Sequence, residues 1–209
     1  MGKRVFKVWD LPSSGTLAAL VVLSAAFLFG GLVGCMLAKQ VGGEGDRALT
    51  EYLQYYLSAA VSGKIPDPEW FSVLWETVRW PLVTFALGLT PLGLIGIPIV
   101  FFIRGFLLSF AIASFFRVLG GLGLALSFVV FGVSGLICIP ILFSLGVQGI
   151  LYAGALTGRL TGDCKKSFPS NRIILLHCGV CIIALFISCF IEYNVIPVLT
   201  GTLAGFLPA

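Results

Sequence analysis

Long apolar runs separated by short polar stretches dominate the pattern of the chain. Thr16 to Ala38 holds no charged residue, Trp80 to Phe116 holds only Arg104, and Val118 to Gly158 holds none. About 20 apolar residues in a helix cross the hydrocarbon core of a bilayer, so the pattern predicts several transmembrane helices. A single helix from Val118 to Gly158 would reach about 60 Å, twice the thickness of that core. This run must therefore fold back or contain a re-entrant segment.

Glycine and proline predict where the longer runs break. We expect a tight turn at Arg104-Gly105, and a half-crossing or a broken helix over residues 124–136. In the first span, Gly30 and Gly34 form a GxxxG pattern, which is typical of closely packed membrane helices. The residues that mark the later breaks are Gly120, Gly121, Gly123, Gly132, Gly135 and Pro140. The predicted spans cover residues 16–38, roughly 78–103, 105–120 and 137–158, and 173–195.

The only long polar stretch covers residues 39–77 and holds six of the nine acidic residues. Apolar residues at helical spacing within it predict an amphipathic helix over 47–62. This helix either lies on the membrane or the bundle, or forms a docking surface for an outside partner. Asp67 followed by Pro68 predicts the start of the next helix. The tryptophans that mark where this helix enters the lipid are Trp70, Trp75 and Trp80.

Composition excludes several classes of protein. Apolar residues make up 58% of the chain and charged residues 11%, and the mean hydropathy is +1.07. A soluble domain carries about 25% charged residues, so a soluble enzyme, a disordered linker and a nucleic-acid-binding protein are excluded. The sequence predicts an all-α, polytopic transmembrane helical bundle of about five spans, with residues 1–209 as a single membrane domain. The bundle is expected to lie in the lipid bilayer, and the sequence is compatible with a homo-oligomer.

The positions of Lys and Arg predict the orientation, because cytoplasmic loops are rich in these residues. The basic tail 1–15 is expected in the cytoplasm, which places the acidic stretch 39–77 outside. The basic loop 159–172 is expected inside, so four spans precede it and the tail 197–209 lies outside. The protein is therefore expected in the cell membrane as a multi-pass protein with a cytoplasmic amino terminus.

Candidate chemistry is sparse. No catalytic motif is recognisable around the one histidine, His177. Cys178 and Cys181 form a CxxC in an apolar helix, which favours core packing over a metal site. We interpret all six cysteines as reduced and structural. No cofactor and no metal are expected, and the protein is not expected to be an enzyme.

Two ionisable residues within the apolar runs need an explanation, because each costs about 2.5–3.5 kcal/mol or more at the bilayer centre. Arg104 is expected at the inner surface, where its cost is small. Glu192 lies near the outer end of the last span and has three interpretations. It reaches outward or bonds to neighbouring backbone, it forms an interhelical polar lock with Arg79 or Arg117, or it serves a proton relay.

The order and spacing of several motifs resemble the stage II sporulation protein M family of endospore-forming bacteria. The family's turn is similar to the segment that runs from Gly96-Ile97-Pro98 to Arg104-Gly105. The family's apolar segment ending in proline is similar to Leu136 to Pro140. Phe190 to Pro197 resembles its closing Glu-to-Pro element. Residues 131–135 depart from the wider group, which often carries a polar cluster there, because only Ser134 is polar. The motif residues are Pro98, Arg104, Gly105, Pro140, Glu192 and Pro197.

The resemblance implies a membrane scaffold without chemistry of its own. Such a protein anchors and localises a peptidoglycan-degrading complex, with stage II sporulation proteins D and P as partners, during septal thinning and engulfment. It implies the mother-cell or septal membrane as the location. A small membrane permease, or a subunit of a transporter complex, is the alternative function. The residues expected to contact the partner are Tyr52, Tyr55, Tyr56 and Trp70.

Overall fold

The computed structural model describes residues 14–40, 47, 50–51, 55, 70–160, 179 and 181–194, which are helical apart from the turn at 89–92. Three apolar segments are long enough to cross a membrane, Gly15–Gln40, Gly93–Val118 and Gly135–Arg159, and Cys181–Asn194 forms a shorter apolar helix. The predicted all-α polytopic membrane bundle is thus confirmed. The elements are α1 (Ser14–Gln40), α3 (Trp70–Gly88), α4 (Gly93–Ser127), the π-helix η2 (Phe128–Gly132), α5 (Val133–Leu160) and the carboxyl-terminal helix Cys181–Asn194.

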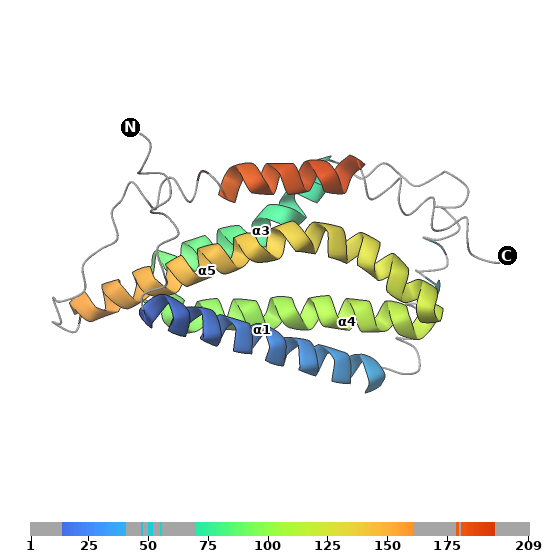
Figure 1. The fold of residues 1–209 in the computed structure, drawn as a ribbon, viewed down its shortest axis with the longest axis horizontal. Helices are drawn as coiled ribbons and strands as arrows, with labels where there is room; N and C mark the ends of the chain where they lie inside the picture. The colour runs from blue at the N-terminus through green and yellow to red at the C-terminus, as the bar shows by residue number, and fades with distance from the viewer. Residues whose placement is uncertain are drawn as a thin grey trace.

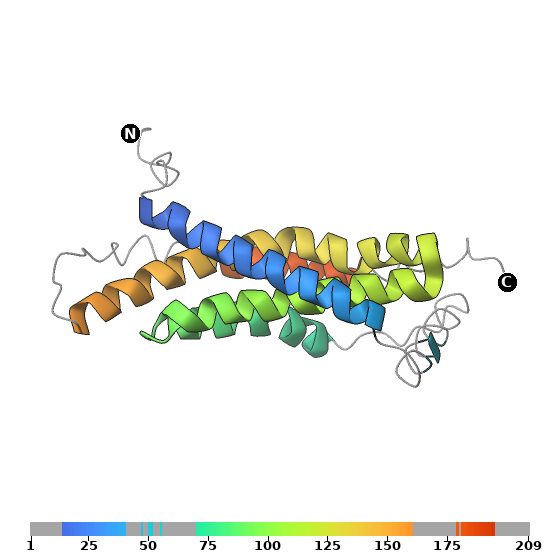
Figure 2. The same cartoon turned by 90° about the horizontal axis from the view of Figure 1, so that it is seen from below.

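The helices lie lengthwise beside one another (Figures 1 and 2). α1 and α4 run side by side in one direction, α3 and α5 run in the opposite direction, and the carboxyl-terminal helix lies on the side of the bundle away from α1. The beginning of α1, the α3–α4 turn and the end of α5 all lie at the left end in Figure 1. Among the described helices, the beginning of α1 and the end of α5 therefore lie at the same end of the bundle.

Glycines allow the backbones of α1 and α4 to touch. A Cβ added to Gly30 or Gly34 would fall on the carbonyl oxygen of Phe102 or Phe106. From the other side, a Cβ added to Gly105 would fall on the carbonyl oxygen of Phe27. Only glycine permits such an approach, which is the use of small residues at membrane helix contacts. The predicted GxxxG packing face is therefore confirmed, and its partner is α4.

The apolar core lies where α1, α4 and α5 meet. Leu23, Ile97 and Phe101 are fully buried there. The Phe101 ring packs edge-on against the Phe143 ring at a centroid distance of 4.9 Å, and Phe27 joins from α1 at 5.9 Å. Aromatic pairs in this geometry add about 0.5–1.5 kcal/mol beyond the burial of their area. This core fixes α5 against the α1–α4 pair.

The predicted turn at Arg104-Gly105 is wrong, and with it the division of this run into spans 78–103 and 105–120. α3 ends at Gly88, residues 89–92 form the turn, and α4 begins at Gly93. Pro91 lies within the turn. The Thr90 hydroxyl donates to the carbonyl oxygen of Leu87 at 2.9 Å, and thereby satisfies one of the acceptors in the last turn of α3. Gly105 instead serves the contact with α1, which explains a glycine in the middle of a helix.

The break expected near Gly120 is present, but its continuation differs from the prediction. Gly120 has φ 60° and ψ −135° inside α4, a backbone conformation that favours glycine. Beyond it the chain packs back on α4, because the Phe131 ring lies edge-on to the Phe115 ring at 5.7 Å. Residues 124–136 are helical throughout, with a π-helical turn at Phe128–Gly132 in place of the predicted half-crossing or broken helix. Pro140 lies within α5 and does not break it.

Few residues of the predicted outer helix 47–62 are described. Residues 47, 50, 51 and 55 are, and each is helical. Of the fifth predicted span, the structure describes residues 179 and 181–194. The predicted residues Tyr52, Tyr56, Asp67, Cys178 and Pro197, residues 1–13 and the tail 197–209 lie outside the described residues.

Candidate functional site

The depth of Arg104 follows from its neighbours across the α1–α4 contact. Gly105 packs on the Phe27 carbonyl, and Gly30 packs on the Phe102 carbonyl. Phe27 is the midpoint of the uncharged run 16–38. Arg104 therefore lies near the centre of the membrane and not at the inner surface, so the prediction of a surface arginine is wrong. A guanidinium at this depth needs stabilising contacts from the protein.

Trp80 supplies one such contact. The guanidinium carbon of Arg104 lies 5.6 Å from the centroid of the Trp80 ring, and that of Arg79 lies 5.5 Å from it. Two cations therefore share one indole. A cation over a tryptophan face gains about 2 kcal/mol when it is desolvated. The ring thus offsets part of the cost of placing both arginines in an apolar bundle.

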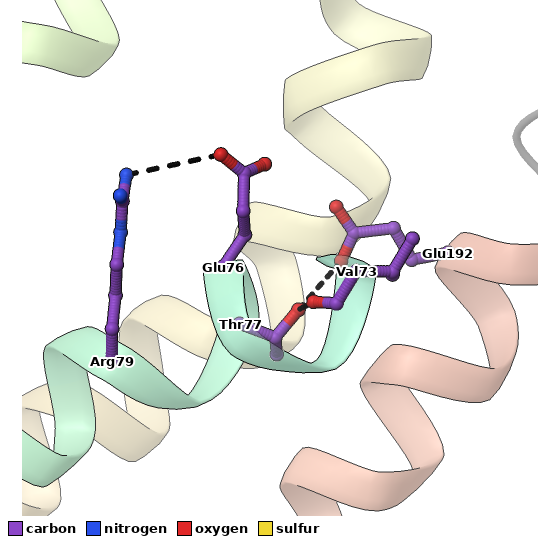
Figure 3. Close-up of polar contacts among 5 residues, drawn as sticks. All are labelled: Val73, Glu76, Thr77, Arg79 and Glu192. Carbon is purple, nitrogen blue, oxygen red and sulfur yellow. Dashed lines mark hydrogen bonds and ion pairs between the residues drawn. The ribbon is translucent and has the colours of Figure 1, made fainter. Parts of the chain in front are cut away.

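Glu192 is held by a hydrogen bond across helices. The Thr77 hydroxyl lies 3.0 Å from Oε2 of Glu192 and 2.9 Å from the carbonyl oxygen of Val73, one turn earlier in α3 (Figure 3). Thr77 is buried, so this contact lies inside the bundle. Of the three interpretations of Glu192, the interhelical lock describes this geometry, with Thr77 as the partner that the structure shows.

The two arginines named as partners of Glu192 make other contacts. Arg79 lies 3.9 Å from the carboxylate of Glu76, one turn away on the same helix (Figure 3). Arg117 donates to the carbonyl oxygen of Ala38 in the last turn of α1. Carbonyls in the last turn of a helix have no partner within it, so Arg117 ties the end of α1 to α4.

These contacts form one group, which we call the central polar cluster: Glu76, Thr77, Arg79, Trp80, Arg104 and Glu192. Its two carboxylates lie within Coulombic range of Arg104, and its formal charges balance. A pocket of only about 10 Å³ lies beside Arg104 and Trp80, roughly the volume that admits one water molecule. The cluster can therefore hold charges and fix helices, but the pocket beside it has no room for a solute.

A second polar contact lies close to the cluster. The sulfur of Cys138 in α5 lies 3.3 Å from the Ser188 hydroxyl on the carboxyl-terminal helix, and Cys138 also lines the pocket beside Arg104. Ser188 is fully buried. The carboxyl-terminal helix is therefore attached by polar contacts to both α3 and α5.

The other predicted residues have structural positions. Pro98 lies in the second turn of α4, and Pro140 lies exposed in α5. Trp70 packs edge-on against Tyr193 at 5.4 Å, so part of this expected partner-contact side chain is used within the bundle. Tyr55 is 72% exposed. The structure therefore brings Arg104, Glu192 and Trp70 to the contact region of α3 and the carboxyl-terminal helix, whereas the side chains of Tyr55 and Pro140 are exposed.

Sequence reasoning missed Thr77 and treated Trp80 only as an interface marker. A signal was present in the spacing of α3. Thr77, Pro81, Thr84 and Gly88 recur at helical intervals and are the buried residues of this helix. Small and hydroxyl-bearing residues at such spacing are typical of the contact face of a membrane helix.

Thr77→Val should lower the free energy of unfolding by about 1–2 kcal/mol, because the Glu192 carboxylate loses a donor inside the bundle. Glu192→Gln should cost less, since an amide oxygen still accepts from Thr77. Thr84→Val is the matched control, because the fully buried Thr84 hydroxyl donates within α3, to the Trp80 carbonyl. Unfolding of the purified protein in bicelles measures all three. Equal losses for Thr77→Val and Thr84→Val would contradict the interhelical lock.

Comparison with known proteins supports the resemblance. The family model described as Stage II sporulation protein M matches residues 22–197. No curated protein and no solved structure matches the chain. Because the matched segment covers most of the chain and includes the whole central polar cluster, the chain belongs to the stage II sporulation protein M family.

Proposed function

We propose that this member of the stage II sporulation protein M family is a non-catalytic membrane scaffold. It anchors and localises a peptidoglycan-degrading complex during septal thinning and engulfment in endospore formation. Family membership over residues 22–197 is the observation that carries the proposal, and it makes the chain a sporulation-related membrane protein. The scaffold role and the partners, stage II sporulation proteins D and P, are the proposed step beyond it.

The bundle has properties that suit an anchor. The described helices enclose an apolar core, and the Glu192 and Arg104 side chains each contact a residue of α3 from another helix. A permease needs a polar path or pocket that fits its substrate. The pocket beside Arg104 has a volume of only about 10 Å³, and a larger pocket lined by α4, η2 and the start of α5 is almost wholly apolar. These observations favour the scaffold over the permease.

Residues 39–69, the part of the stretch 39–77 that precedes α3, are the proposed contact region, because residues 70–77 form the first two turns of α3 in the bundle. With a cytoplasmic amino terminus, this stretch faces the cell wall, where hydrolases act on peptidoglycan. It carries five acidic residues, and its Tyr55 side chain is 72% exposed. Exposed tyrosines supply large contact areas at a small entropic cost, which is why they are enriched at protein interfaces. A mother-cell or septal location of the protein is part of the same proposal.

Simultaneous replacement of Tyr52, Tyr55 and Tyr56 by alanine should abolish co-purification of stage II sporulation proteins D and P from sporulating cells. The substituted protein should still insert into the membrane, because none of the three lies in an apolar span. Tyr152→Ala, in α5 near the opposite end of the bundle, is the control and should retain both partners. Undiminished co-purification with the triple variant would count against this contact region.

A further inference from the structure

Pro81 deprives a backbone acceptor of α3 of its helical partner. Proline has no N–H, so the carbonyl oxygen of Thr77, four residues earlier, loses the hydrogen bond that an α-helix would give it. Pro81 and Thr77 are both among the buried residues of α3. In membrane helices a carbonyl freed in this way is bonded by neighbouring helices, by polar side chains or by ordered water. The Thr77 carbonyl therefore needs another donor.

Donors that lack an acceptor are present in the same region. The indole Nε1 of Trp80 is buried and finds no hydrogen-bond partner among the described residues. The Arg104 guanidinium carries several N–H groups, and its contact with the face of the Trp80 ring cannot occupy all of them. A buried donor without an acceptor loses the hydrogen bonds that water would give it, which destabilises the fold. Trp80 and Arg104 therefore need an acceptor.

One small pocket is lined by the residues that carry both needs. Thr77, Trp80 and Pro81 line it from α3, Arg104 lines it from α4, and Cys138 is among the lining residues of α5. Its volume is about 10 Å³, and a buried water requires about this volume together with about two to four polar partners. The pocket thus meets both requirements, because it offers one acceptor and two donor side chains.

The chemistry of the lining selects water over an ion. The Thr77 carbonyl oxygen carries partial negative charge and repels an anion, whereas the Arg104 guanidinium repels a cation. Water is neutral, and it donates two hydrogen bonds and accepts two. It is therefore the one ligand of this size that matches the carbonyl, the indole N–H and the guanidinium together.

We propose that this pocket is a binding site for a single water molecule near the centre of the membrane. The water donates one hydrogen bond to the Thr77 carbonyl oxygen. It accepts one from Nε1 of Trp80 and one from the Arg104 guanidinium. Its second hydrogen faces the sulfur of Cys138, a weak acceptor.

The bound water extends the contact that holds Glu192. The Thr77 hydroxyl donates to the Glu192 carboxylate at 3.0 Å, and the water on the Thr77 carbonyl connects the same residue to Arg104. Bonds bridged by water are nearly as favourable in enthalpy as direct ones. α3, α4 and the carboxyl-terminal helix are then joined through one threonine, and Arg104 is hydrated at a depth where lipid supplies no acceptor. The site belongs to the bundle itself and stands whether or not the scaffold function holds.

Nuclear magnetic resonance on the isotope-labelled, unsubstituted full chain in lipid nanodiscs detects this water. Magnetisation transferred from water to the indole N–H of Trp80 reports a water within hydrogen-bond distance, and Trp80→Phe assigns the signal by its loss. The control is the backbone amide of Leu23, which is fully buried in the apolar core. Transfer to the Trp80 indole should be about fivefold faster or more, because only this N–H has a water partner. Equal transfer to the two groups would overturn the proposal.

A water-soluble paramagnetic chelate distinguishes an isolated water from an open aqueous path. Trp75 is 57% exposed and lies in the region where α3 meets the membrane surface, so its indole N–H should relax strongly. The Trp80 indole should show about one fifth of that enhancement or less, because the pocket admits one water and no chelate. An enhancement as large as that of Trp75 would mean a water-filled path and would overturn the single-water site.

Pro81→Ala tests the acceptor. Alanine supplies the N–H that an α-helix directs to the Thr77 carbonyl, so the water loses its acceptor, and transfer to the Trp80 indole should fall about threefold or more. Pro140→Ala is the matched control, since Pro140 also lies inside a helix but is exposed and outside the pocket lining. Transfer that is equally unaffected in both variants would overturn the role of the carbonyl. If Pro81→Ala folds poorly, the measurements on the unsubstituted chain still decide the proposal.

Discussion

Gly105→Ala is expected to lower the stability of the bundle by about 1–3 kcal/mol or more, and Gly105→Val to prevent its assembly. The added Cβ of Gly105→Ala would lie 2.2 Å from the carbonyl oxygen of Phe27 and 3.0 Å from its carbonyl carbon. These are backbone atoms in the middle of α1, so they cannot yield as the end of a flexible side chain would. α1 and α4 would have to separate along their whole contact, and overpacking of this kind costs about 1–3 kcal/mol or more.

Gly154→Ala in α5 is the matched control for this prediction. No atom outside its immediate helical surroundings lies within 4 Å of the position that its Cβ would take. Alanine is favoured over glycine within a helix by about 1 kcal/mol, so this variant should be as stable as the unsubstituted chain or more stable. Thermal unfolding in detergent, followed by tryptophan fluorescence, compares the two. If Gly105→Ala and Gly154→Ala change the midpoint alike, the glycine contact does not hold the bundle.

Trp80→Leu is expected to destabilise the protein by about 3 kcal/mol, the lower end of the cost of replacing a core Phe or Trp by alanine. The loss has two parts. Trp80 packs against the α1–α4–α5 core, and its ring faces the guanidinium groups of Arg79 and Arg104. Leucine restores some of the apolar volume but offers no aromatic face to either cation, so both arginines remain in an apolar environment without it.

Trp80→Phe separates these two parts. Phenylalanine retains an aromatic face, so the Trp80→Phe protein should be more stable than the Trp80→Leu protein by about 1–2 kcal/mol. It also removes the indole Nε1, which is buried and has no hydrogen-bond partner within the described part of the chain. In an Arg104→Met background the difference between leucine and phenylalanine should shrink, because one cation is gone. A difference that is unchanged in that background would show that the ring acts only through its volume.

The attachment of the carboxyl-terminal helix explains why Glu192 tolerates its apolar surroundings. The helix is short, and much of its surface, including Ile183 and Phe190, is exposed. Its polar contacts with the rest of the bundle include the hydrogen bond from Thr77 to Glu192 and the contact between Cys138 and Ser188. In hydrocarbon such contacts resist rearrangement, because each polar group would otherwise lose its partner.

Apolar run length and composition determined the class of this protein. Runs such as Thr16 to Ala38 are too long and too uniformly apolar for a soluble core, so helices that cross a bilayer follow from the sequence alone. The break at Gly120 and the GxxxG packing face of α1 were also readable, because glycine has distinct backbone and packing uses. The order of motifs likewise identified the family that the comparison confirms.

The placement of Arg104 and Gly105 could not be read from the sequence. A charge next to a glycine in an apolar run has two local interpretations, a turn at the membrane surface or a buried contact in mid-helix, and the local sequence is the same for both. The choice between a turn and a buried contact depends on which groups of other helices lie opposite Arg104 and Gly105. The Phe27 carbonyl of α1 takes the space of a Cβ at Gly105, and the Trp80 ring of α3 receives the Arg104 guanidinium.

The sequence by itself therefore determined a lipid-embedded helical bundle, its glycine contact face and its family. Only the tertiary structure decided that the α3–α4 turn lies at residues 89–92, that Arg104 lies deep in the membrane and that Thr77 holds Glu192. The physical reason is that hydropathy depends on each residue and its near neighbours. The stabilisation of a buried charge depends instead on side chains that other helices bring to it.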